Sequence, residues 1–585
     1  IYAVDSTLNL ESGCVVDNNK NEDGKYGYGA GIYLKQDKGS ATLTGKGLTV
    51  SNNISKYYGG GIFASGGSIN LTEGSSISGN QSEKQSGGGI YMYNGATLTG
   101  NKLTVSGNSC LYYGGGIYAS GSTLNLENGC AVQENWNTSA SYGYGGGIYL
   151  TGSANLTGSN LTISKNIAAN CGGGIYAKKS NITLNGNNGL NSLFSENESR
   201  KDGGAIWVNY GTLSATDTVF EKNVSGKSGA VYASSIDGIA ISGCRFIGNE
   251  KTGTTADASA LDISANSGYV TIENSIFSGN RNGRTLILER FNEKTASVTN
   301  TIFEGNIGGD YVVYSRKTVF ENCQFTGNTS SEATIRTYGN KGDLTFRNCK
   351  ITGNTVTGTS GAAGIQVSMS STVTLEETTE GTTEVANNEG GESGGILVKA
   401  GGTLNIKSGT TVHNNTGNEC GGIYNMEGTV NIEENTAVYD NLMGSVANDL
   451  RIAANQKIDT IEADQMKATG KDFTGYYWVD AQNGLPKWLR TDESGNEVFE
   501  AVPETLDAER FYTAMPYTAK PVAELLHGNE DAKKYFSLAE AVRAAQDGDT
   551  VRLIYSEEKP ENNTPVYESV EITGKKITLN LNRRL

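Results

Sequence analysis

The sequence predicts an all-β chain, folded for most of its length as a parallel β-helix (a solenoid) of about 16 coils with three short strands per coil. Two repeated motifs and the placement of proline predict this fold. A glycine run followed by an apolar and an aromatic residue recurs at Gly59–Phe63, Gly87–Tyr91, Gly114–Tyr118, Gly145–Tyr149 and Gly172–Tyr176. An apolar residue followed three positions later by asparagine recurs 16 times between Val16 and Asn441. All six prolines lie at or beyond Pro486, as expected if strands use every backbone N–H of the preceding part.

The spacing of the asparagine motif sets the size of one coil. From Asn19 to Asn441 the motif advances 422 residues in 15 steps, about 28 residues per repeat. Within a repeat, three short segments alternate apolar and polar residues, for example Ile117–Ala119, Leu124–Leu126 and Ala131–Val132. A propeller blade needs four strands in a longer period, and sandwiches and barrels do not repeat one three-strand unit. The period therefore indicates stacked coils.

The two motifs have separate roles in this interpretation. Glycine permits the tight turn, while the isoleucine after it points into the core. Because coils stack at about 4.8 Å, equivalent residues lie above one another, and inward asparagines can form a hydrogen-bonded amide ladder. The predicted ladder comprises Asn53, Asn80, Asn108, Asn135, Asn166, Asn197, Asn223, Asn249, Asn280, Asn306, Asn328 and Asn354.

The middle of the repeat region differs from its flanks. From Phe194 to Phe325 six successive ladder positions hold Phe where the flanks hold Val or Ile, and the glycine motif decays over the same stretch. We expect a stack of phenylalanine rings in the core. Five cysteines lie two residues before a ladder position, so they face inward as small apolar residues: Cys14, Cys130, Cys244, Cys323 and Cys349. Cys323 and Cys349 belong to adjacent coils and can approach each other.

Three regions follow from these patterns. Residues 1–472 form the β-helix, and residues 473–520, which lose the period and gain Pro and Trp, form a cap or connector. Residues 521–585 form a smaller module. In it, Phe536–Gly548 predicts one short α-helix, with Ser537 and Glu540 as a capping box and Gly548 as the stop. Strand patterns follow the helix, so the module is either the helix-capped start of a second β-helix or a small α+β unit.

Composition excludes several classes of function. A net charge of −16 argues against nucleic acid as a partner, because phosphate binding needs a basic surface. There is no apolar run of 18 residues or more that could span a membrane. With two histidines and no Cys-x-x-Cys pair we expect no metal and no cofactor. Both ends of the sequence fall inside strand patterns, so we expect a fragment of a longer chain.

Two motifs resemble those of a known family. Gly203–Ile206 (Gly-Gly-Ala-Ile), with Phe220–Asn223 and Phe277–Asn280 (Phe-x-x-Asn), resembles the paired repeats of the chlamydial polymorphic outer membrane proteins. Residues 1 to about 455 resemble the right-handed parallel β-helix passengers and adhesins of bacterial surface proteins. The resemblance implies a right-handed coil, in agreement with the usual hand of parallel crossovers. It also implies secretion and display at the bacterial cell surface for cell adhesion.

One outward feature is a candidate for binding. If each isoleucine of the glycine motif points inward, the next residue points outward and forms an aromatic column. Stacked aromatics stabilise neighbouring strands by themselves. As a functional site the column would bind a host or bacterial surface glycan or protein, or another copy of the chain. Its residues are Tyr33, Phe63, Tyr91, Tyr118, Tyr149, Tyr176, Trp207 and Tyr232.

No catalytic motif is visible in the sequence. Glycoside hydrolysis needs two carboxylates at a fixed separation, and no acidic motif of that kind stands out. Arg281, Arg284, Arg290 and Lys294 form the one dense basic group, which we interpret as a solvated edge. The sequence therefore favours a non-enzymatic extracellular adhesin or stalk, with no catalytic residues. A purely structural spacer or filament segment is the first alternative, and a polysaccharide lyase or hydrolase of the pectin-lyase-like fold is the second.

Overall fold

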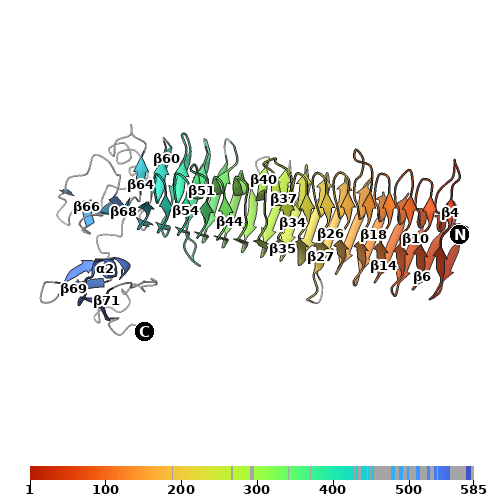
Figure 1. Cartoon of the computed structure of the whole chain (residues 1–585), viewed down its shortest axis with the longest axis horizontal. Helices are drawn as coiled ribbons and strands as arrows, with labels where there is room; N and C mark the ends of the chain where they lie inside the picture. The colour runs from red at the N-terminus through yellow and green to blue at the C-terminus, as the bar shows by residue number, and fades with distance from the viewer. Residues whose placement is uncertain are drawn as a thin grey trace.

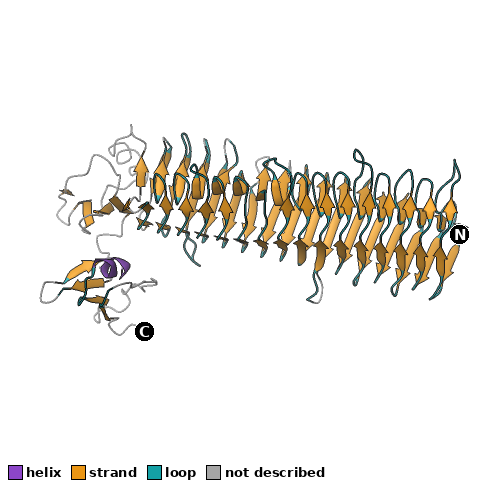
Figure 2. Ribbon diagram, viewed as in Figure 1, coloured by secondary structure: helices purple, strands orange, loops and turns teal. Residues whose placement is uncertain are grey.

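The chain folds into stacked coils that form a rod, seen in the computed structural model of Figure 1. The structure describes residues 1–452 except 187–188, 265–267, 290–294, 340–341, 369, 427, 433–435, 445 and 448–449. Beyond residue 452 it describes 476–480, 486–491, 497–499, 509–513, 523–527, 532–535, 538–553 and 575–580. Strands account for nearly all the regular structure (Figure 2).

One coil shows the pattern of all. Strands β17 (Ile117–Ser120), β18 (Thr123–Glu127) and β19 (Ala131–Gln133) follow the glycine run in order. Side chains alternate between buried and partly exposed along each strand, as period two requires. A fourth strand of two residues, β20 (Trp136–Asn137), follows the ladder asparagine. The three predicted strands per coil are therefore present, and the short fourth strand was not predicted.

Equivalent strands of successive coils pair in parallel. The strand after the glycine run builds a 17-stranded sheet, here called sheet A, and the next strand builds a 16-stranded sheet B. The register keeps equivalent residues in line, for example Ile117 with Ile148 and Tyr118 with Tyr149. Sheet A begins with β1 (Tyr2–Val4), β5 (Ile32–Lys35), β9 (Ile62–Ser65), β13 (Ile90–Tyr93), β17, β21 (Ile148–Thr151), β25 (Ile175–Lys178), β29 (Ile206–Asn209) and β33 (Val231–Ser234). It continues with β37 (Ala258–Ser264), β40 (Arg284–Glu289), β43 (Tyr311–Ser315), β47 (Ala333–Thr337), β51 (Ala362–Val367), β55 (Ile396–Val398), β59 (Ile423–Asn425) and β64 (Leu450–Ile452).

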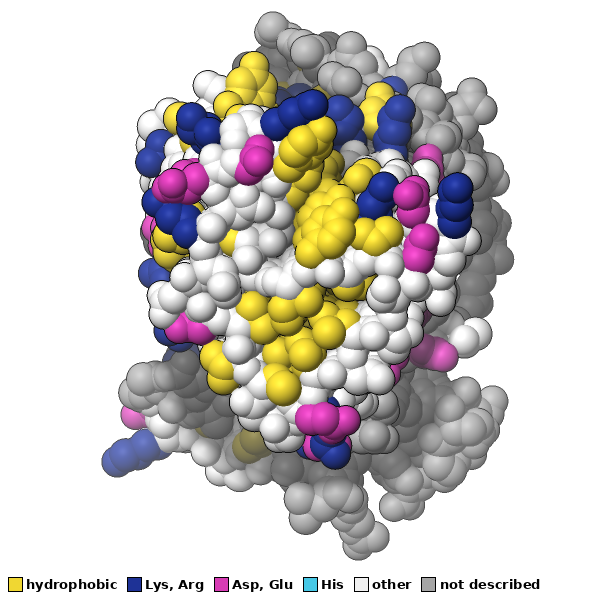
Figure 3. Space-filling view, turned by 90° about the vertical axis from the view of Figure 1, so that its right-hand side faces the viewer, with side chains coloured by type: hydrophobic (Ala, Val, Ile, Leu, Met, Phe, Trp, Pro, Cys, Tyr) yellow, Lys and Arg dark blue, Asp and Glu magenta, His cyan; other side chains and the backbone are white. Residues whose placement is uncertain are grey.

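A single apolar core runs along the inside of the rod. It extends from Ala3 to Val438, and apolar side chains occupy the centre of the N-terminal end face in Figure 3. The predicted phenylalanine stack is confirmed: neighbouring ring centroids from Phe194 to Phe325 lie 4.6–5.1 Å apart, and all six rings are fully buried.

The asparagines of the second motif form one continuous chain of hydrogen bonds. Asn135 is typical: its Nδ2 donates to Asn166 Oδ1 at 2.9 Å and to the Val105 carbonyl at 2.9 Å. Its Oδ1 accepts from the backbone N and the Nδ2 of Asn108, at 3.0 and 2.9 Å. The same amide-to-amide bond of 2.9–3.0 Å links every neighbouring pair from Asn53 to Asn354. Each buried amide is therefore satisfied, which makes a polar row inside the core tolerable.

Two turns of each coil, the one before the ladder asparagine and the one at the glycine run, use residues in the left-handed backbone conformation. The residue before each ladder asparagine has a positive φ, whether it is a glycine such as Gly279 (62°) or a residue with a side chain such as Lys222 (51°). In the glycine run, Gly114 has a φ of 64°. A Cβ on the next residue, Gly115, would lie 2.5 Å from the Trp136 carbonyl oxygen. The run therefore supplies both the turn and the close approach of successive coils.

The inward cysteines behave as predicted. Cys130, Cys244, Cys323 and Cys349 are buried and Cys14 is partly buried against the core, and all eight cysteines are free thiols. Burial, and then the neighbouring Cys323, raise the pKa of Cys349, and neither cysteine forms a disulfide.

The described segments after the rod are of two kinds. Antiparallel strands β65 (Tyr476–Asp480), β66 (Pro486–Thr491), β67 (Glu497–Phe499) and β68 (Glu509–Thr513) end the stack, because β68 pairs with β61 (Thr436–Tyr439). Further on, helix α2 (Leu538–Ala544) packs on a mixed sheet of β69 (Ala523–Leu526), β70 (Lys533–Tyr535), β71 (Thr550–Leu553) and β72 (Thr578–Asn580). The predicted helix is present, while Ser537 of the proposed capping box lies outside the described residues.

Candidate binding surface

Sheet A brings all eight predicted aromatic residues into one column. Neighbouring ring centroids from Tyr33 to Trp207 lie 4.2–5.5 Å apart with ring planes within 14° of parallel. The spacing widens to 6.3 Å between Trp207 and Tyr232, where the column ends. Tyr2 extends the stack at the other end. The parallel register of sheet A places these rings directly above one another.

The stacking changes what the column presents to solvent. Each ring face lies against the next ring, so ring edges and hydroxyl groups point outward. Phe63, Tyr149 and Tyr176 are only 3%, 9% and 7% exposed. Burial is also the main cause that raises the pKa of Tyr91, Tyr149 and Tyr176, and that of Tyr232 to about 12. The ring faces of the predicted column are therefore not available to a ligand along most of its length.

A second column of tyrosines lies beside the first. Tyr28, Tyr58, Tyr113 and Tyr144 each precede a glycine run, and they remain half-buried. Tyr113 stacks on Tyr149 at 4.8 Å, and Tyr144 contacts Tyr176 at the same distance. Sequence reasoning missed this column, although the recurring Tyr before the first glycine was its signal. We call the two columns together the tyrosine surface.

Comparison with known families agrees with this architecture. A family model described as a right handed β-helix region matches residues 30–214 and 229–379, more than half of the chain. The chain belongs to the right-handed β-helix family. Neither the search of curated proteins nor the search of solved structures gave a match. In the part of the chain that the structure describes, no helix is long and apolar enough to cross a membrane.

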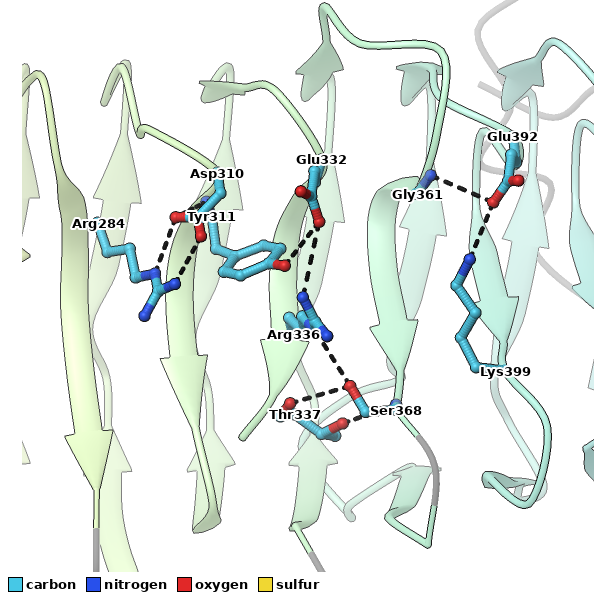
Figure 4. Close-up of polar contacts among 10 residues, drawn as sticks. All are labelled: Arg284, Asp310, Tyr311, Glu332, Arg336, Thr337, Gly361, Ser368, Glu392 and Lys399. Carbon is cyan, nitrogen blue, oxygen red and sulfur yellow. Dashed lines mark hydrogen bonds and ion pairs between the residues drawn. The ribbon is translucent and has the colours of Figure 1, made fainter. Parts of the chain in front are cut away.

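Beyond Tyr232 the β-helix carries a charged network on the same sheet (Figure 4). Arg284 donates through Nε to Asp310 at 2.8 Å and through its Nη2 at 2.5 Å, and its guanidinium lies 5.0 Å from the centre of the Tyr311 ring. The Arg336 guanidinium lies 4.8 Å from the same ring, and the Tyr311 hydroxyl donates to Glu332 at 2.6 Å. These five residues define the charged network. Irregular pairing of sheet A at β37–β40 and β47–β51 brackets it, as bulges often bracket special sites.

The network corrects the interpretation of the basic group as a solvated edge. Arg284 is 9% exposed and paired, because it begins strand β40 where the turn folds it over sheet A. Arg281, three residues earlier, stays largely exposed and lies 3.6 Å from Glu250. Arg290 and Lys294 lie outside the described residues.

Asp202, Asp257 and Asp262 lie between the tyrosine surface and the charged network, and the charges of Asp202 and Asp257 act on Asp262. Asp262 is 7% exposed, its carboxylate accepts a hydrogen bond from the Ser228 hydroxyl, and burial raises its pKa to about 7. Nearby Asp202 and Asp257 each have one buried oxygen without a hydrogen-bond partner among the described residues. Burial also raises the pKa of Asp202. No linear motif in the sequence indicated these three residues.

No group of three or more His, Cys, Asp or Glu side chains that could hold a metal occurs within the described residues. The three carboxylates therefore do not form such a group.

Proposed function

We propose that this β-helix is the rod of an extracellular bacterial surface adhesin, which binds a surface glycan or protein through the tyrosine surface without catalysing a reaction. The regular row of aromatic residues on the outer face of sheet A carries the proposal. Outward positions of sheet B in the same coils are small and polar, for example Thr97, Thr99 and Thr123. The apolar core closes without the tyrosines. Hydroxyl groups and ring edges that repeat once per coil match a partner whose own binding groups repeat, such as a polysaccharide. A second copy of this chain is also a partner with repeating groups.

The test distinguishes ligand binding by the tyrosine hydroxyls from the structural role of the stacked rings. Tyr33, Tyr91 and Tyr118 are replaced together by Phe, which keeps the ring stack, as the natural Phe63 does, and removes the hydroxyls. The control replaces Thr97, Thr99 and Thr123 of sheet B by Ala. Binding of the whole chain is measured on glycan arrays and on bacterial and host cell surfaces. We expect the Phe variant to lose binding and the control to keep it, with the same melting curve for all three proteins. Unchanged binding by the Phe variant counts against the tyrosine surface.

A purely structural spacer is the alternative that the uninterrupted ladder and core favour. A spacer needs length and stiffness and no ligand. Absence of binding by the native chain to every glycan, cell surface and second copy tested would favour it over the adhesin.

Polysaccharide cleavage is a third candidate, favoured by Asp202, Asp257 and Asp262. Hydrolysis increases reducing ends, whereas a lyase also creates an unsaturated product that absorbs in the ultraviolet. Either signal from the native chain, lost in Asp262→Asn, would support an enzyme over an adhesin.

A further inference from the structure

Asparagine followed directly by glycine occurs six times in the sequence, at Asn94, Asn128, Asn185, Asn188, Asn282 and Asn483. Glycine has no side chain that could shield its backbone nitrogen from the amide of the preceding asparagine. The nitrogen can attack that amide when the fold lets the two groups approach each other. Asn188 and Asn483 lie outside the described residues. The other four pairs can be compared by what holds each amide and each nitrogen in place.

Two hydrogen bonds hold the pair at Asn94. The Asn94 Nδ2 donates to Ser65 Oγ at 3.2 Å. The backbone N–H of Gly95 donates to the Gly121 carbonyl at 3.0 Å. Both bonds must break before the Gly95 nitrogen can reach the Asn94 amide, so the fold slows the reaction here.

A hydrogen bond also holds each of two further pairs. After Asn185, the backbone N–H of Gly186 donates to the Thr216 carbonyl at 2.9 Å. The Asn282 Nδ2 donates to Glu250 Oε1 at 2.9 Å. The first of these pairs is therefore restrained at its nitrogen and the second at its amide.

The pair at Asn128 lacks such restraints. Asn128 and Gly129 form an exposed turn between β18 and β19. Within the part of the chain that the structure describes, the Asn128 side chain makes no hydrogen bond and the Gly129 N–H donates none. A Cβ added to Gly129 would meet no atom within 4 Å. The amide and the nitrogen are therefore free to meet at this turn.

The same turn occurs two coils earlier with a carboxylate in place of the amide. Glu73 and Gly74 have φ values of 52° and 80°, against 51° and 85° for Asn128 and Gly129. Among the described residues the Gly74 N–H likewise donates no hydrogen bond, and a Cβ there would meet no atom within 4 Å. The Glu73 Oε1 lies 3.1 Å from Lys46 Nζ. A carboxylate at this position is therefore compatible with the coil.

We propose that Asn128 is a site of spontaneous deamidation in the folded chain, with water as the co-reactant. The Gly129 nitrogen attacks Asn128 Cγ, and its proton passes through solvent to the departing amide nitrogen. The new C–N bond closes a five-membered succinimide while the Cγ–Nδ2 bond breaks and ammonia leaves. Water then adds to one of the two succinimide carbonyls and opens the ring to aspartate or isoaspartate. Overall, an amide and one water become a carboxylic acid and ammonia, with no oxidation or reduction.

The two products differ in their effect on the coil. Aspartate keeps the length of the backbone, so position 128 should tolerate it as the matched turn tolerates Glu73. Isoaspartate lengthens the backbone between β18 and β19, because the chain then runs through the former side chain. That change should loosen the turn beside Cys130, which is buried in the core directly after Gly129.

The experiment incubates the whole folded chain at mildly alkaline pH and follows each Asn-Gly pair by peptide mapping with mass spectrometry. Enzymatic methylation of isoaspartate identifies the second product. We expect Asn128 to react about tenfold faster than Asn94, because two hydrogen bonds restrain Asn94 and neither group of the Asn128 pair is restrained. Asn185 and Asn282 should react at intermediate rates. In urea, where the fold is lost, all the pairs should react at similar rates.

Two variants test whether the turn sets the rate. Asn128→Gln should stop the reaction at this position, because glutamine would have to close a larger ring. Glu73→Asn places an Asn-Gly pair in the matched turn and should deamidate at a rate similar to that of Asn128. Both positions are exposed, so neither substitution should change the melting curve.

Two outcomes overturn the proposal. In the first, Asn128 reacts no faster than Asn94 in the folded chain although both react in urea. In the second, the Glu73→Asn variant stays unmodified while Asn128 reacts, so that the open turn does not set the rate. Neither outcome bears on the proposed adhesin function, which does not depend on position 128.

Discussion

The two halves of the rod use one backbone but cover it differently. In the first half, from β5 to β33 of sheet A, the outward position holds stacked aromatic rings, and we call this part the tyrosine half. From β37 onward, in the part we call the charged half, the same register position holds Asp262, Ile287, Tyr314, Arg336 and Gln366. Inside, the asparagine ladder crosses the boundary without change, and the phenylalanine stack from Phe194 to Phe325 spans it. The difference indicates that inward positions specify the coil, and that outward positions are free to carry function.

The largest effect should come from the element that both halves share. Replacing Asn135 by Ala removes the acceptor for two donors of Asn108 and the donor for the Val105 carbonyl. At about 1–3 kcal/mol for each buried group left unpaired, we expect a loss of about 3–5 kcal/mol of local stability. The Asn280→Ala substitution in the charged half should reduce the local stability by the same amount. Amide hydrogen exchange is the suitable measurement, because a stack of coils opens locally.

Outward Asn125, on sheet B, serves as the control for this prediction. Its replacement by Ala should change exchange little, because the side chain is only partly buried and makes no ladder bond. A cost at Asn135 that differs strongly from that at Asn280 would mean that the two halves do not share one ladder.

The boundary between the halves should respond to pH. The pKa of Asp262 is about 7 in the folded chain, against 3.8 for an ordinary Asp, because burial and the nearby Glu289, Asp257 and Asp202 disfavour its charge. The unfolded chain therefore gives up this proton at lower pH than the folded chain. Local stability should fall as pH rises from about 4 to about 7 and level off above, by a few kcal/mol in total. Asp262→Asn should remove this dependence, measured as hydrogen exchange of β33, β37 and β40 at several pH values.

Salt should distinguish the halves by a smaller amount. Ion pairs near the surface weaken with ionic strength, whereas stacked rings do not. Raising NaCl from 0.05 to 1 M should speed exchange in β40–β47, around Arg284 and Arg336, by the equivalent of about 1 kcal/mol or less. Exchange in β13–β25 should not increase. If salt speeds hydrogen exchange equally in β40–β47 and β13–β25, the ion pairs of the charged network do not contribute a salt-dependent stability of their own.

The sequence predicted the residues that point into the core better than those that point outward. The coil, the asparagine ladder and the phenylalanine stack were predictable, because period two and a constant repeat leave one inward face. Arg284 was wrongly assigned to a solvated edge. The number of basic residues in a segment does not indicate that the turn leaves Arg281 exposed and folds Arg284 over the sheet. Asp202 lies two coils before Asp257 and Asp262, so only the stacking register brings it near them. The aromatic column was predictable as a row, but its lack of exposed ring faces depends on ring orientation.

The smallest effect concerns the left-handed residue before each ladder asparagine. From Gly248 to Gly353 this residue is glycine in every coil, whereas earlier coils also use Glu134, Lys165, Glu196 and Lys222 at φ values of 51–55°. A side chain in this conformation costs about 1 kcal/mol, while glycine adds disorder to the unfolded chain.

We therefore expect Lys222→Gly to stabilise its coil by less than about 1 kcal/mol and the reverse change, Gly279→Lys, to destabilise by about the same amount. A Cβ at Gly279 would meet no atom within 4 Å, so backbone conformation alone sets its cost. Hydrogen exchange of the adjacent amides measures both variants. If Gly279→Lys costs several kcal/mol instead, the two halves differ in how tightly the ladder turn is held and not only in what covers it.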